Sequence, residues 1–350
     1  MSTMFPLPPF EHVTVAREQD VARWATSTVS QAMAARPDAS ASGAAIVRAG
    51  GVDVLDLMKQ GVLTPSRLVD IRRIPSLGQL RTAADGTLGI GACVTLERLA
   101  GDDAIRRHHT ALADAAAHTA TPQLRHVSTI GGNLLQRPRC WYLRDEHVSC
   151  RRKGGQHCPA RDGEHEYHAI FDNARCAAVH ASTPATALLA LDARVEVRTA
   201  RGEARTHELS AFLLAPGEAP ERDSALGPGD LLTAVLLPPP VPGRSSAHIK
   251  QGQRTSYDWA LVDVAVVLDR AADQAVTRAR IALGSVAPTP RRALDAEALL
   301  LGAPVTADRA ARAGRAALAG VTPLARNGYK LPLLETVVTR AILRAAGLGR

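Results

Sequence analysis

The chain has 350 residues, of which 46% are hydrophobic, so whole-chain disorder is excluded and two domains or one large composite fold are expected. Aromatic residues make up only 3%, too few for the stacking platforms of a single-strand nucleic-acid binder, and the net charge of +8 does not by itself identify a partner. No apolar run reaches the ~18 to 20 residues of a membrane span, and residues 1–9 lack signal-peptide features, so we expect a soluble chain without its own export signal.

The first part of the chain alternates short strand and helix patterns. A helix is predicted over residues 20–35, and a strand–loop–helix unit follows, with an apolar run at 44–48, a glycine break at 49–51 and helical spacing over 52–60. The remaining elements predicted here are strands at 67–71 and 87–94 and a long alanine-rich helix at 102–120. Such alternation indicates a layered unit of strands and helices.

Between residues 121 and 178 the periodic apolar pattern disappears. This stretch holds four of the five cysteines, several histidines and a run of basic residues. So long a segment without a hydrophobic repeat needs something other than an apolar core to order it.

Regular patterns return after residue 183. The predicted elements are a helix at 184–191, strands at 194–198, 231–237, 248–253, 260–268 and 279–283, and helices at 307–319 and 331–346. The proline run at 238–243 cannot continue a helix or a strand, so a domain boundary is predicted near residue 240.

Two glycine-containing loops are candidates for holding phosphate groups. The first, residues 48–53, lies between a predicted strand and a helix whose first N–H groups could face an anion. The second, residues 128–133, combines hydroxyl groups, paired glycines and an amide. Neither loop matches the dinucleotide fingerprint or a P-loop. Two interpretations therefore stay open at this point: the loops bind the two phosphates of a dinucleotide, or they are a pair of surface turns.

The clustered cysteines are Cys140, Cys150, Cys158 and Cys176. Their spacing contains no short C-x2–4-C pair of the kind usual in zinc sites, and four thiolates on an irregular loop suit a [4Fe–4S] cluster. A zinc site with four thiolates and two disulfides are the alternatives. Interleaved basic residues would lower thiolate pKa values and offset the charge of a cluster. Cys93 lies in a strand pattern and is predicted to be a small core residue.

Four stretches carry a resemblance to a known family. They are Ala49-Gly50-Gly51-Val52-Asp53-Val54-Leu55-Asp56-Leu57-Met58-Lys59, then Gln123-Leu124-Arg125 followed by Thr129-Ile130-Gly131-Gly132-Asn133-Leu134-Leu135-Gln136-Arg137, then the stretch from Arg139 and Cys140 through Cys176 to His180, and Lys250-Gln251-Gly252-Gln253-Arg254 with Tyr257. In this order they resemble the FAD-binding (medium) subunits of the xanthine dehydrogenase, aldehyde oxidoreductase and carbon monoxide dehydrogenase family of molybdenum hydroxylases. The chain is most similar to the branch of this family that carries an extra [4Fe–4S] cluster, as in periplasmic aldehyde oxidoreductase and 4-hydroxybenzoyl-CoA reductase.

The resemblance implies an α+β fold. Residues 1–240 would form a two-lobed FAD-binding domain of the PCMH or vanillyl-alcohol-oxidase type, with an inserted iron–sulfur loop at about 137–180. Residues 245–350 would form a smaller α+β domain like the C-terminal domain of carbon monoxide dehydrogenase flavoproteins.

The resemblance also implies the cofactor sites. The first loop would wrap the FAD pyrophosphate, and Thr129, Gly132 and Asn133 would form a second wall. Leu232 matches an apolar position beside the flavin, and Lys250 matches a lysine that approaches it. The first-loop residues are Ile46, Val47, Arg48, Ala49, Gly50, Gly51, Val52, Asp53, Val54 and Leu55, and the cluster ligands would be Cys140, Cys150, Cys158 and Cys176.

Two positions depart from the family pattern. The usual aspartate that contacts FAD is Thr183 in this chain, and Val52 stands where threonine is common. Because loop N–H groups supply most phosphate contacts, FAD binding is expected to persist with altered affinity.

The implied function is electron transfer rather than substrate chemistry, and no nucleophile–base arrangement stands out. A molybdenum-cofactor large subunit and a [2Fe–2S] small subunit would pass electrons to this chain, whose cluster and FAD would deliver them to an external small-molecule or protein acceptor. No nucleic-acid partner and no membrane span are expected. The chain would be periplasmic, exported with a partner, or cytoplasmic. The alternatives are a standalone flavin oxidase with a disulfide-bonded loop and a zinc-stabilised nucleic-acid-binding or scaffold protein.

Overall fold

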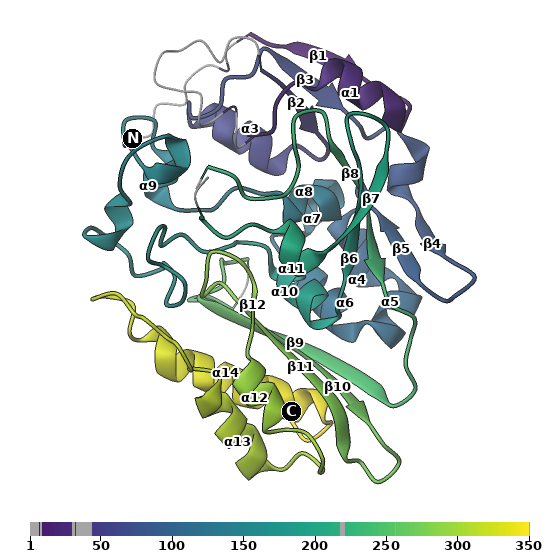
Figure 1. The fold of residues 1–350 in the computed structure, drawn as a ribbon, viewed down its shortest axis with the longest axis vertical. Coiled ribbons are helices and arrows are strands. Elements are labelled where there is room, and N and C mark those ends of the chain that lie inside the picture. Colours follow the sequence, from purple (N-terminus) through teal and green to yellow (C-terminus); the bar gives the residue numbers. More distant parts are fainter. Residues whose placement is uncertain are drawn as a thin grey trace.

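Three sheets organise the computed structural model, which describes residues 7, 9–29, 32, 44–217, 221–255 and 257–349. A three-stranded sheet, a five-stranded sheet and a four-stranded sheet follow one another from the N-terminal to the C-terminal part of the chain (Figure 1). Helices cover separate faces of these sheets, so the fold is α+β as predicted. None of the helices within the described residues is long and apolar enough to cross a lipid bilayer.

The N-terminal lobe is built on a parallel sheet in the order β1–β3–β2. Helix α3 connects β2 to β3, so the glycine turn before α3 lies at the carboxyl end of a parallel strand. In open sheets of parallel strands this edge is the usual place for a ligand. The elements are β1 (Glu11–Thr14), β2 (Ala45–Arg48), β3 (Arg67–Asp70), η1 (Glu18–Asp20), α1 (Val21–Trp24), α3 (Val52–Lys59) and η2 (Pro75–Gly78).

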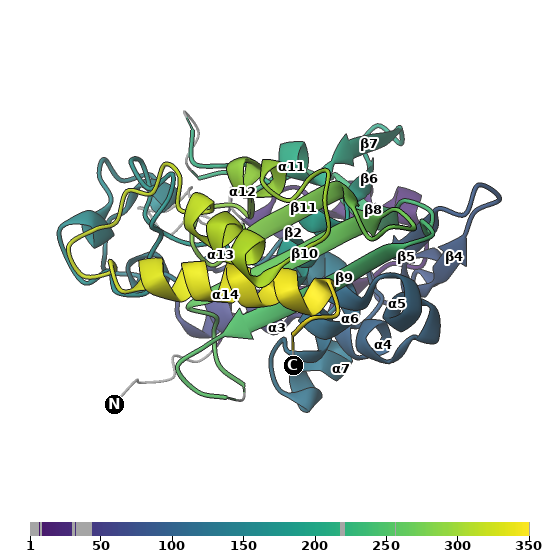
Figure 2. The same cartoon turned by 90° about the horizontal axis from the view of Figure 1, so that it is seen from below.

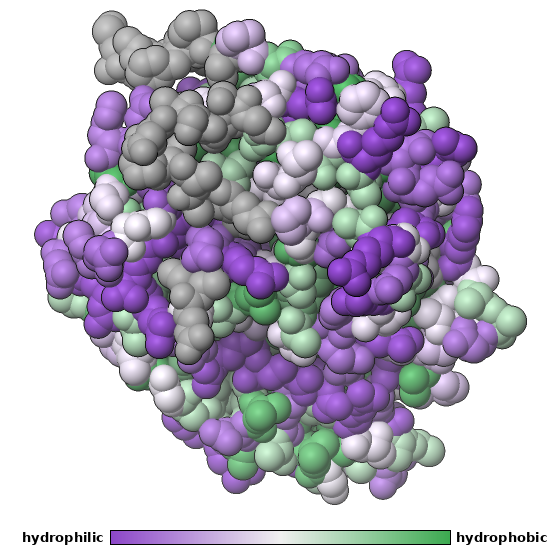
Figure 3. Space-filling model, turned by 45° about the horizontal axis from the view of Figure 1, so that its top comes forward, coloured by the Kyte–Doolittle hydropathy of each residue, from purple (hydrophilic) through white to green (hydrophobic). Residues whose placement is uncertain are grey.

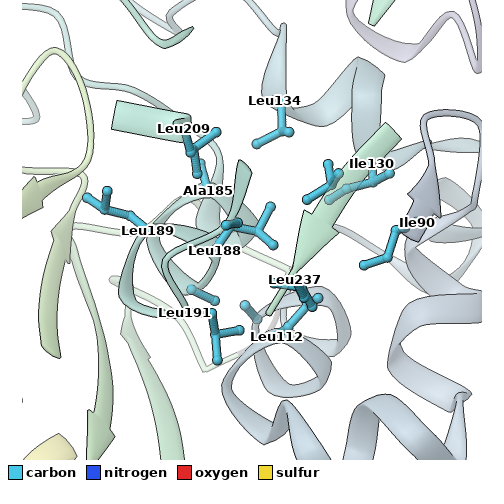
Figure 4. Close-up of a cluster of buried hydrophobic side chains, with 14 of the residues drawn as sticks. Ile90, Leu112, Ile130, Leu134, Ala185, Leu188, Leu189, Leu191, Leu209 and Leu237 are labelled. Carbon is cyan, nitrogen blue, oxygen red and sulfur yellow. The ribbon is translucent and has the colours of Figure 1, made fainter. Parts of the chain in front are cut away.

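The second lobe is an antiparallel sheet in the order β4–β5–β8–β6–β7, covered by helices. Figure 4 shows its core, in which Leu188 of α10 lies among Ile130, Leu134 and Leu237. The strands are β4 (Leu80–Thr82), β5 (Leu88–Gly91), β6 (Arg194–Arg198), β7 (Ala204–Glu208) and β8 (Leu231–Leu237). The helices are α4 (Leu96–Gly101), α5 (Asp103–His108), α6 (Thr110–Ala117), α7 (Pro122–Val127), α8 (Ile130–Leu134), α10 (Thr183–Ala190) and α11 (Leu209–Phe212).

The C-terminal part is an antiparallel sheet in the order β12–β11–β10–β9, with α14 lying across it (Figure 2). The other face of this sheet packs on α6 and α10 of the second lobe, so α10 is enclosed and all eight of its residues are buried. The elements are β9 (Arg244–Gln251), β10 (Val262–Arg270), β11 (Val276–Gly284), β12 (Arg291–Arg292), α12 (Leu294–Ala298), α13 (Ala307–Ala316) and α14 (Lys330–Ala345).

Two predicted helices are wrong in extent. Within the described residues, the helix predicted over residues 20–35 is interrupted after α1, because the backbone there turns to β2, where the N–H groups of Thr26 and Ser27 donate to the Ala45 carbonyl. Residues 29 and 32 are helical again. Residues 30, 31 and 33–35 lie outside the described residues. The helix predicted over 102–120 is broken at His109 (φ −136°, ψ 47°), and Asp102 caps only its first half.

The surface is mainly hydrophilic on the face shown in Figure 3, where apolar side chains occur in small separate groups. Exposed leucines of the C-terminal part include Leu294, Leu301 and Leu348. Single exposed apolar side chains are ordinary on soluble domains and need no functional explanation.

Candidate cofactor-binding site

A cleft lies between the N-terminal lobe and the second lobe, with a water-accessible volume of about 180 Å³. Its walls come from the turn between β2 and α3, from residues 128–137, and from the segment that leads into β8. Eleven of the predicted FAD-site residues line it together: Val47, Ala49, Gly50, Gly51, Val52, Asp53, Val54, Thr129, Gly132, Asn133 and Leu232.

The first loop requires both of its glycines. A Cβ atom on Gly50 would lie 1.9 Å from the carbonyl oxygen of Val127, so the backbones of the two loops are in contact there. Gly51 has φ +80°, a left-handed conformation that side chains disfavour, and it immediately precedes α3. No side chain caps α3 within the described residues, so its first N–H groups are available to an anion in the cleft.

The second loop is the start of a short helix rather than an irregular turn. Thr129 is the N-cap of α8, and its Oγ1 accepts a hydrogen bond from the N–H of Gly132 at 3.2 Å. Ser182 donates to Asn133 Oδ1 at 2.5 Å, which ties residues preceding α10 to this wall. The sequence pattern predicted the residues of this wall but not its helical conformation or the role of Ser182.

Five of the predicted FAD-site residues do not line the cleft. Ile46 is fully buried in the core of the N-terminal lobe, and Leu55 packs at the edge of that core. Arg48 pairs with Asp70 at 2.7 Å. Thr183 is the buried first residue of α10, and Lys250 donates to the carbonyl of His118 at 2.9 Å. Their roles toward a flavin stay predictions.

Other lining residues were missed by the sequence analysis. The segment from Asp223 to Leu231 contributes much of one wall, and Gln136 and Arg137 extend the second loop. Gly227 and Gly229, close together before a predicted strand, are the signal in the sequence that could have marked this segment as a close-approach turn.

Charged side chains of both signs line the cleft, because Asp53, Asp223 and Asp230 lie in its walls beside two arginines. Arg137 and Arg139 line it, and the Nε atom of each is buried with no hydrogen-bond partner among the described residues. Burial and the neighbouring Arg152 guanidinium lower the pKa of Arg137 to about 9. An unpartnered buried donor is costly, so both groups suit an acceptor such as a phosphate oxygen.

The four clustered cysteines lie on the irregular segment beside this cleft, on the left of Figure 1. Cys140, Cys150 and Cys158 each precede a short helical turn, namely α9 (Trp141–Arg144), η3 (Arg151–Lys153) and η4 (Pro159–Arg161). Backbone N–H groups near each of the four sulfur atoms act to lower the pKa of the thiol, which favours the thiolate.

The four thiols influence one another and titrate differently. Burial, together with smaller contributions from the neighbouring Cys176 and Cys150, raises the pKa of Cys140 to about 12. Burial also raises the pKa of Cys150. A hydrogen bond from Cys158 lowers the pKa of Cys176 well below its ordinary value, and the guanidinium of Arg152 lowers it too; the same hydrogen bond raises the pKa of Cys158.

All five cysteines fall within the described residues and are free thiols, so the disulfide alternative has no bond to support it. Among the described residues, no three His, Cys, Asp or Glu side chains converge as ligands for a single metal ion. An iron–sulfur cluster is larger than one ion, so its thiolates need not converge on one point. Cys93 is half-buried away from this group, beside Asp70 and Arg72, and burial raises its pKa to about 12.

A second cavity, of about 250 Å³, lies between the cysteine-rich segment and a wall formed by Gln253 and residues 258–261. Cys140 and Arg139 line it, and the Arg139 guanidinium stacks over the Trp259 ring at 4.7 Å. Arg139 therefore belongs to the walls of both cavities, and the cysteine-rich segment, the cleft and the C-terminal part meet at this residue.

Comparison with known proteins defines the class first. The FAD binding domain in molybdopterin dehydrogenase matches residues 19–240, and the CO dehydrogenase flavoprotein C-terminal domain matches residues 247–345. The chain is therefore an FAD-binding flavoprotein of the molybdopterin dehydrogenase class. It belongs to the FAD-binding (medium) subunits of the xanthine dehydrogenase, aldehyde oxidoreductase and carbon monoxide dehydrogenase family, which confirms the predicted family and fold class.

Individual relatives agree with this assignment. The chain is 37% identical to the aldehyde oxidoreductase FAD-binding subunit PaoB of Escherichia coli (strain K12), over 85% of this chain and 90% of that protein. It is 28% identical to the carbon monoxide dehydrogenase medium chain of Afipia carboxidovorans, over 85% and 87%. The structure of carbon monoxide dehydrogenase from Hydrogenophaga pseudoflava shares the fold, with a TM-score of 0.73 at 24% identity over 99% of this chain and 100% of that chain.

Proposed function

We propose that this chain is the FAD- and [4Fe–4S]-containing electron-transfer subunit of a heterotrimeric molybdenum hydroxylase of the aldehyde oxidoreductase type. A molybdenum-cofactor large subunit would oxidise the substrate, and a [2Fe–2S] small subunit would pass the electrons to this chain. The relatives named as an FAD-binding subunit and as a medium chain support a role as one component of a larger enzyme. In this proposal, residues 1–240 and 245–350 form its two domains, with the iron–sulfur insertion at about 137–180.

The observation that carries the FAD part is the convergence of two separate loops on one cleft. The N–H groups at the start of α3 and the Thr129 turn would hold the pyrophosphate from two sides. The unpartnered Nε donors of Arg137 and Arg139 would complement the same negative charge. Leu232 supplies an apolar surface in the wall of the cleft.

When bound, FAD can take up electrons singly and release them in pairs, and the chain's own residues bind and orient it. Gly50 allows the two loops to touch, so the phosphate-binding N–H groups keep a fixed separation. Val52 offers a methyl group where a hydroxyl would add one hydrogen bond, and Thr183 is buried at the start of α10. These two departures lower the expected affinity without removing the main-chain contacts.

The cluster part is supported by the thiols and by the charge around them. Four thiols lie in one region, backbone N–H groups near each sulfur favour the thiolate, and none of the four is in a disulfide. Beside them, Asp223 pairs with the guanidinium groups of both Arg137 and Arg152. An anionic cluster would complement the remaining positive charge, which a neutral set of thiols does not.

The test is a visible spectrum of the purified chain together with iron, zinc and sulfide analysis. Flavin absorption with about four irons per chain is the expected result. The variant Cys176→Ser should lose iron, whereas Cys93→Ser, a matched change of a cysteine outside the group, should keep it. Zinc without flavin would contradict the proposal and favour a zinc-stabilised binding protein, and flavin without iron would favour a standalone flavin oxidase.

The partners and the compartment are tested on the native protein. We expect the chain to co-purify with a molybdenum-containing subunit and a [2Fe–2S] subunit, either in the periplasm after export with a partner or in the cytoplasm. Isolation of the chain alone at native expression levels would contradict the assembly, and cell fractionation distinguishes the two compartments.

A further inference from the structure

Arg152 is a buried charge that binding of FAD in the cleft does not explain. Its side chain is 2% exposed, and it does not line the cleft. It lies in η3, two residues after Cys150, within the cysteine-rich segment. A fully buried guanidinium is expensive unless each of its donors meets an acceptor, so its partners indicate what it does.

The two ends of the guanidinium meet acceptors of different kinds. Arg152 Nε donates to the Sγ atom of Cys176 at 3.2 Å. Arg152 Nη1 forms an ion pair with Asp223. Arg137 pairs with the same carboxylate and donates through Nη2 to the backbone carbonyl of Arg152 at 3.2 Å, so the group is held on several sides.

This arrangement joins the two proposed cofactor sites. Asp223 and Arg137 line the FAD cleft, and Arg152 continues from them to a sulfur that would ligate the cluster. We propose that Arg152, held by Asp223 and Arg137, is a positioning residue whose N–H···S hydrogen bond to Cys176 raises the reduction potential of the cluster. The inference rests on the proposed function, because it needs Cys176 to be a cluster ligand.

The direction follows from charge. When one electron enters the cluster from the [2Fe–2S] subunit, the cluster gains one negative charge and no bond is made or broken. A hydrogen bond to a ligating sulfur and a nearby positive charge both stabilise the more negative, reduced form. Because the guanidinium is buried, solvent screens this interaction only weakly.

The experiment compares three variants of the full chain, purified in its native complex. Arg152→Gln removes the charge and the fork of donors, and Arg152→Lys keeps the charge but cannot bridge Asp223 and Cys176 in the same way. Arg151→Gln is the matched control, because Arg151 lies in the same turn and its side chain bonds to none of the described residues. Each preparation is assayed for iron, sulfide and FAD, and then titrated with dithionite while the cluster is followed by electron paramagnetic resonance.

Arg152→Gln should make reduction about tenfold less favourable, which is about 59 mV lower for a one-electron couple. Arg152→Lys should fall between Arg152→Gln and the wild type. Arg151→Gln should change the equilibrium less than about twofold, because Arg151 is only half-buried and solvent screens its charge. If Arg152→Gln loses its iron, the reduction potential of Arg152→Lys is compared with that of the wild type instead.

Equal potentials in the Arg152 variants and in Arg151→Gln would overturn the role of Arg152 while leaving the proposed function intact. Absence of iron and sulfide from the wild-type complex would overturn the cluster, and the role of Arg152 with it. The two failures are therefore distinguishable from the same preparations.

Discussion

The contact between Gly50 and Val127 makes a quantitative prediction about the cleft. The substitution Gly50→Ala would place a Cβ atom 1.9 Å from the Val127 carbonyl oxygen, and Cβ contacts under 3.0 Å are essentially never found. The two loops would therefore have to separate by about 1 Å or more. Since the opposing atom is backbone, no side-chain rotation relieves the clash.

Forced repacking of this kind costs about 1 to 3 kcal/mol. Both loops supply the proposed phosphate contacts, so we expect Gly50→Ala to weaken FAD binding by roughly 5- to 150-fold, the factor that corresponds to this energy. The measurement is FAD affinity by flavin fluorescence titration of the apoprotein, with thermal unfolding monitored in parallel.

The matched control is Gly78→Ala. Gly78 ends η2, and a Cβ atom there would have no neighbour within 4 Å, so affinity and stability should stay at wild-type values. If Gly50→Ala binds FAD as tightly as Gly78→Ala does, the two loops do not set the geometry of the phosphate site and the reasoning is refuted.

Three further predictions concern charge, pH and affinity. Asp223→Asn should lower the free energy of unfolding by about 3 to 5 kcal/mol, because it leaves the buried guanidiniums of Arg137 and Arg152 without their carboxylate; urea unfolding measures it. Burial lowers the pKa of His109 to about 4, so its unfolded form binds a proton first as the pH falls, and stability should drop by up to about 3 kcal/mol between pH 6.5 and pH 4. His109→Gln should flatten that part of the urea-unfolding profile. Val52→Thr should tighten FAD binding by about two- to tenfold, because it adds one hydroxyl donor in the cleft.

Each of these predictions has an outcome that would contradict it. Asp223→Asn should be compared with Glu203→Gln, which breaks an exposed pair with Arg205 and should cost less than about 1 kcal/mol. Equal losses would mean that burial does not matter at Asp223. An unchanged pH profile in His109→Gln would show that this histidine is not held neutral, and weaker FAD binding in Val52→Thr would place the phosphates elsewhere.

Local sequence patterns were sufficient for elements with a strong apolar period. Strand β6 was predicted with its observed bounds because apolar and charged residues alternate along it. Strand β8 was predicted with its observed bounds because it is a mostly apolar run between Asp230 and Pro238. The long helix at residues 102–120 failed because its alanine-rich composition favours a helix through His109, while packing of α6 against α4, α5 and α10 requires a change of direction there.

The candidate site divides in the same way. Gly50, Gly51 and Thr129 could be found because a turn and a helix cap leave short signals in the sequence. Asp223 and Arg152 could not, because an aspartate and an arginine 71 positions apart carry no local mark of an ion pair. For Lys250, the sequence motif predicted a lysine that approaches the flavin. Only the fold decided that its ammonium group donates to the carbonyl of His118.

The sequence by itself determined the chemical groups that are available: two glycine turns, four clustered thiols and an excess of arginine around them. It also determined the family, because those groups occur in a fixed order along the chain. Only the tertiary structure decided which of these groups meet, because the cleft is lined by segments as far apart in the sequence as Ala25 and Leu232. Burial then decided the charge balance, because it is desolvation that makes the Arg137–Asp223–Arg152 group significant, and desolvation depends on the packing of the whole domain.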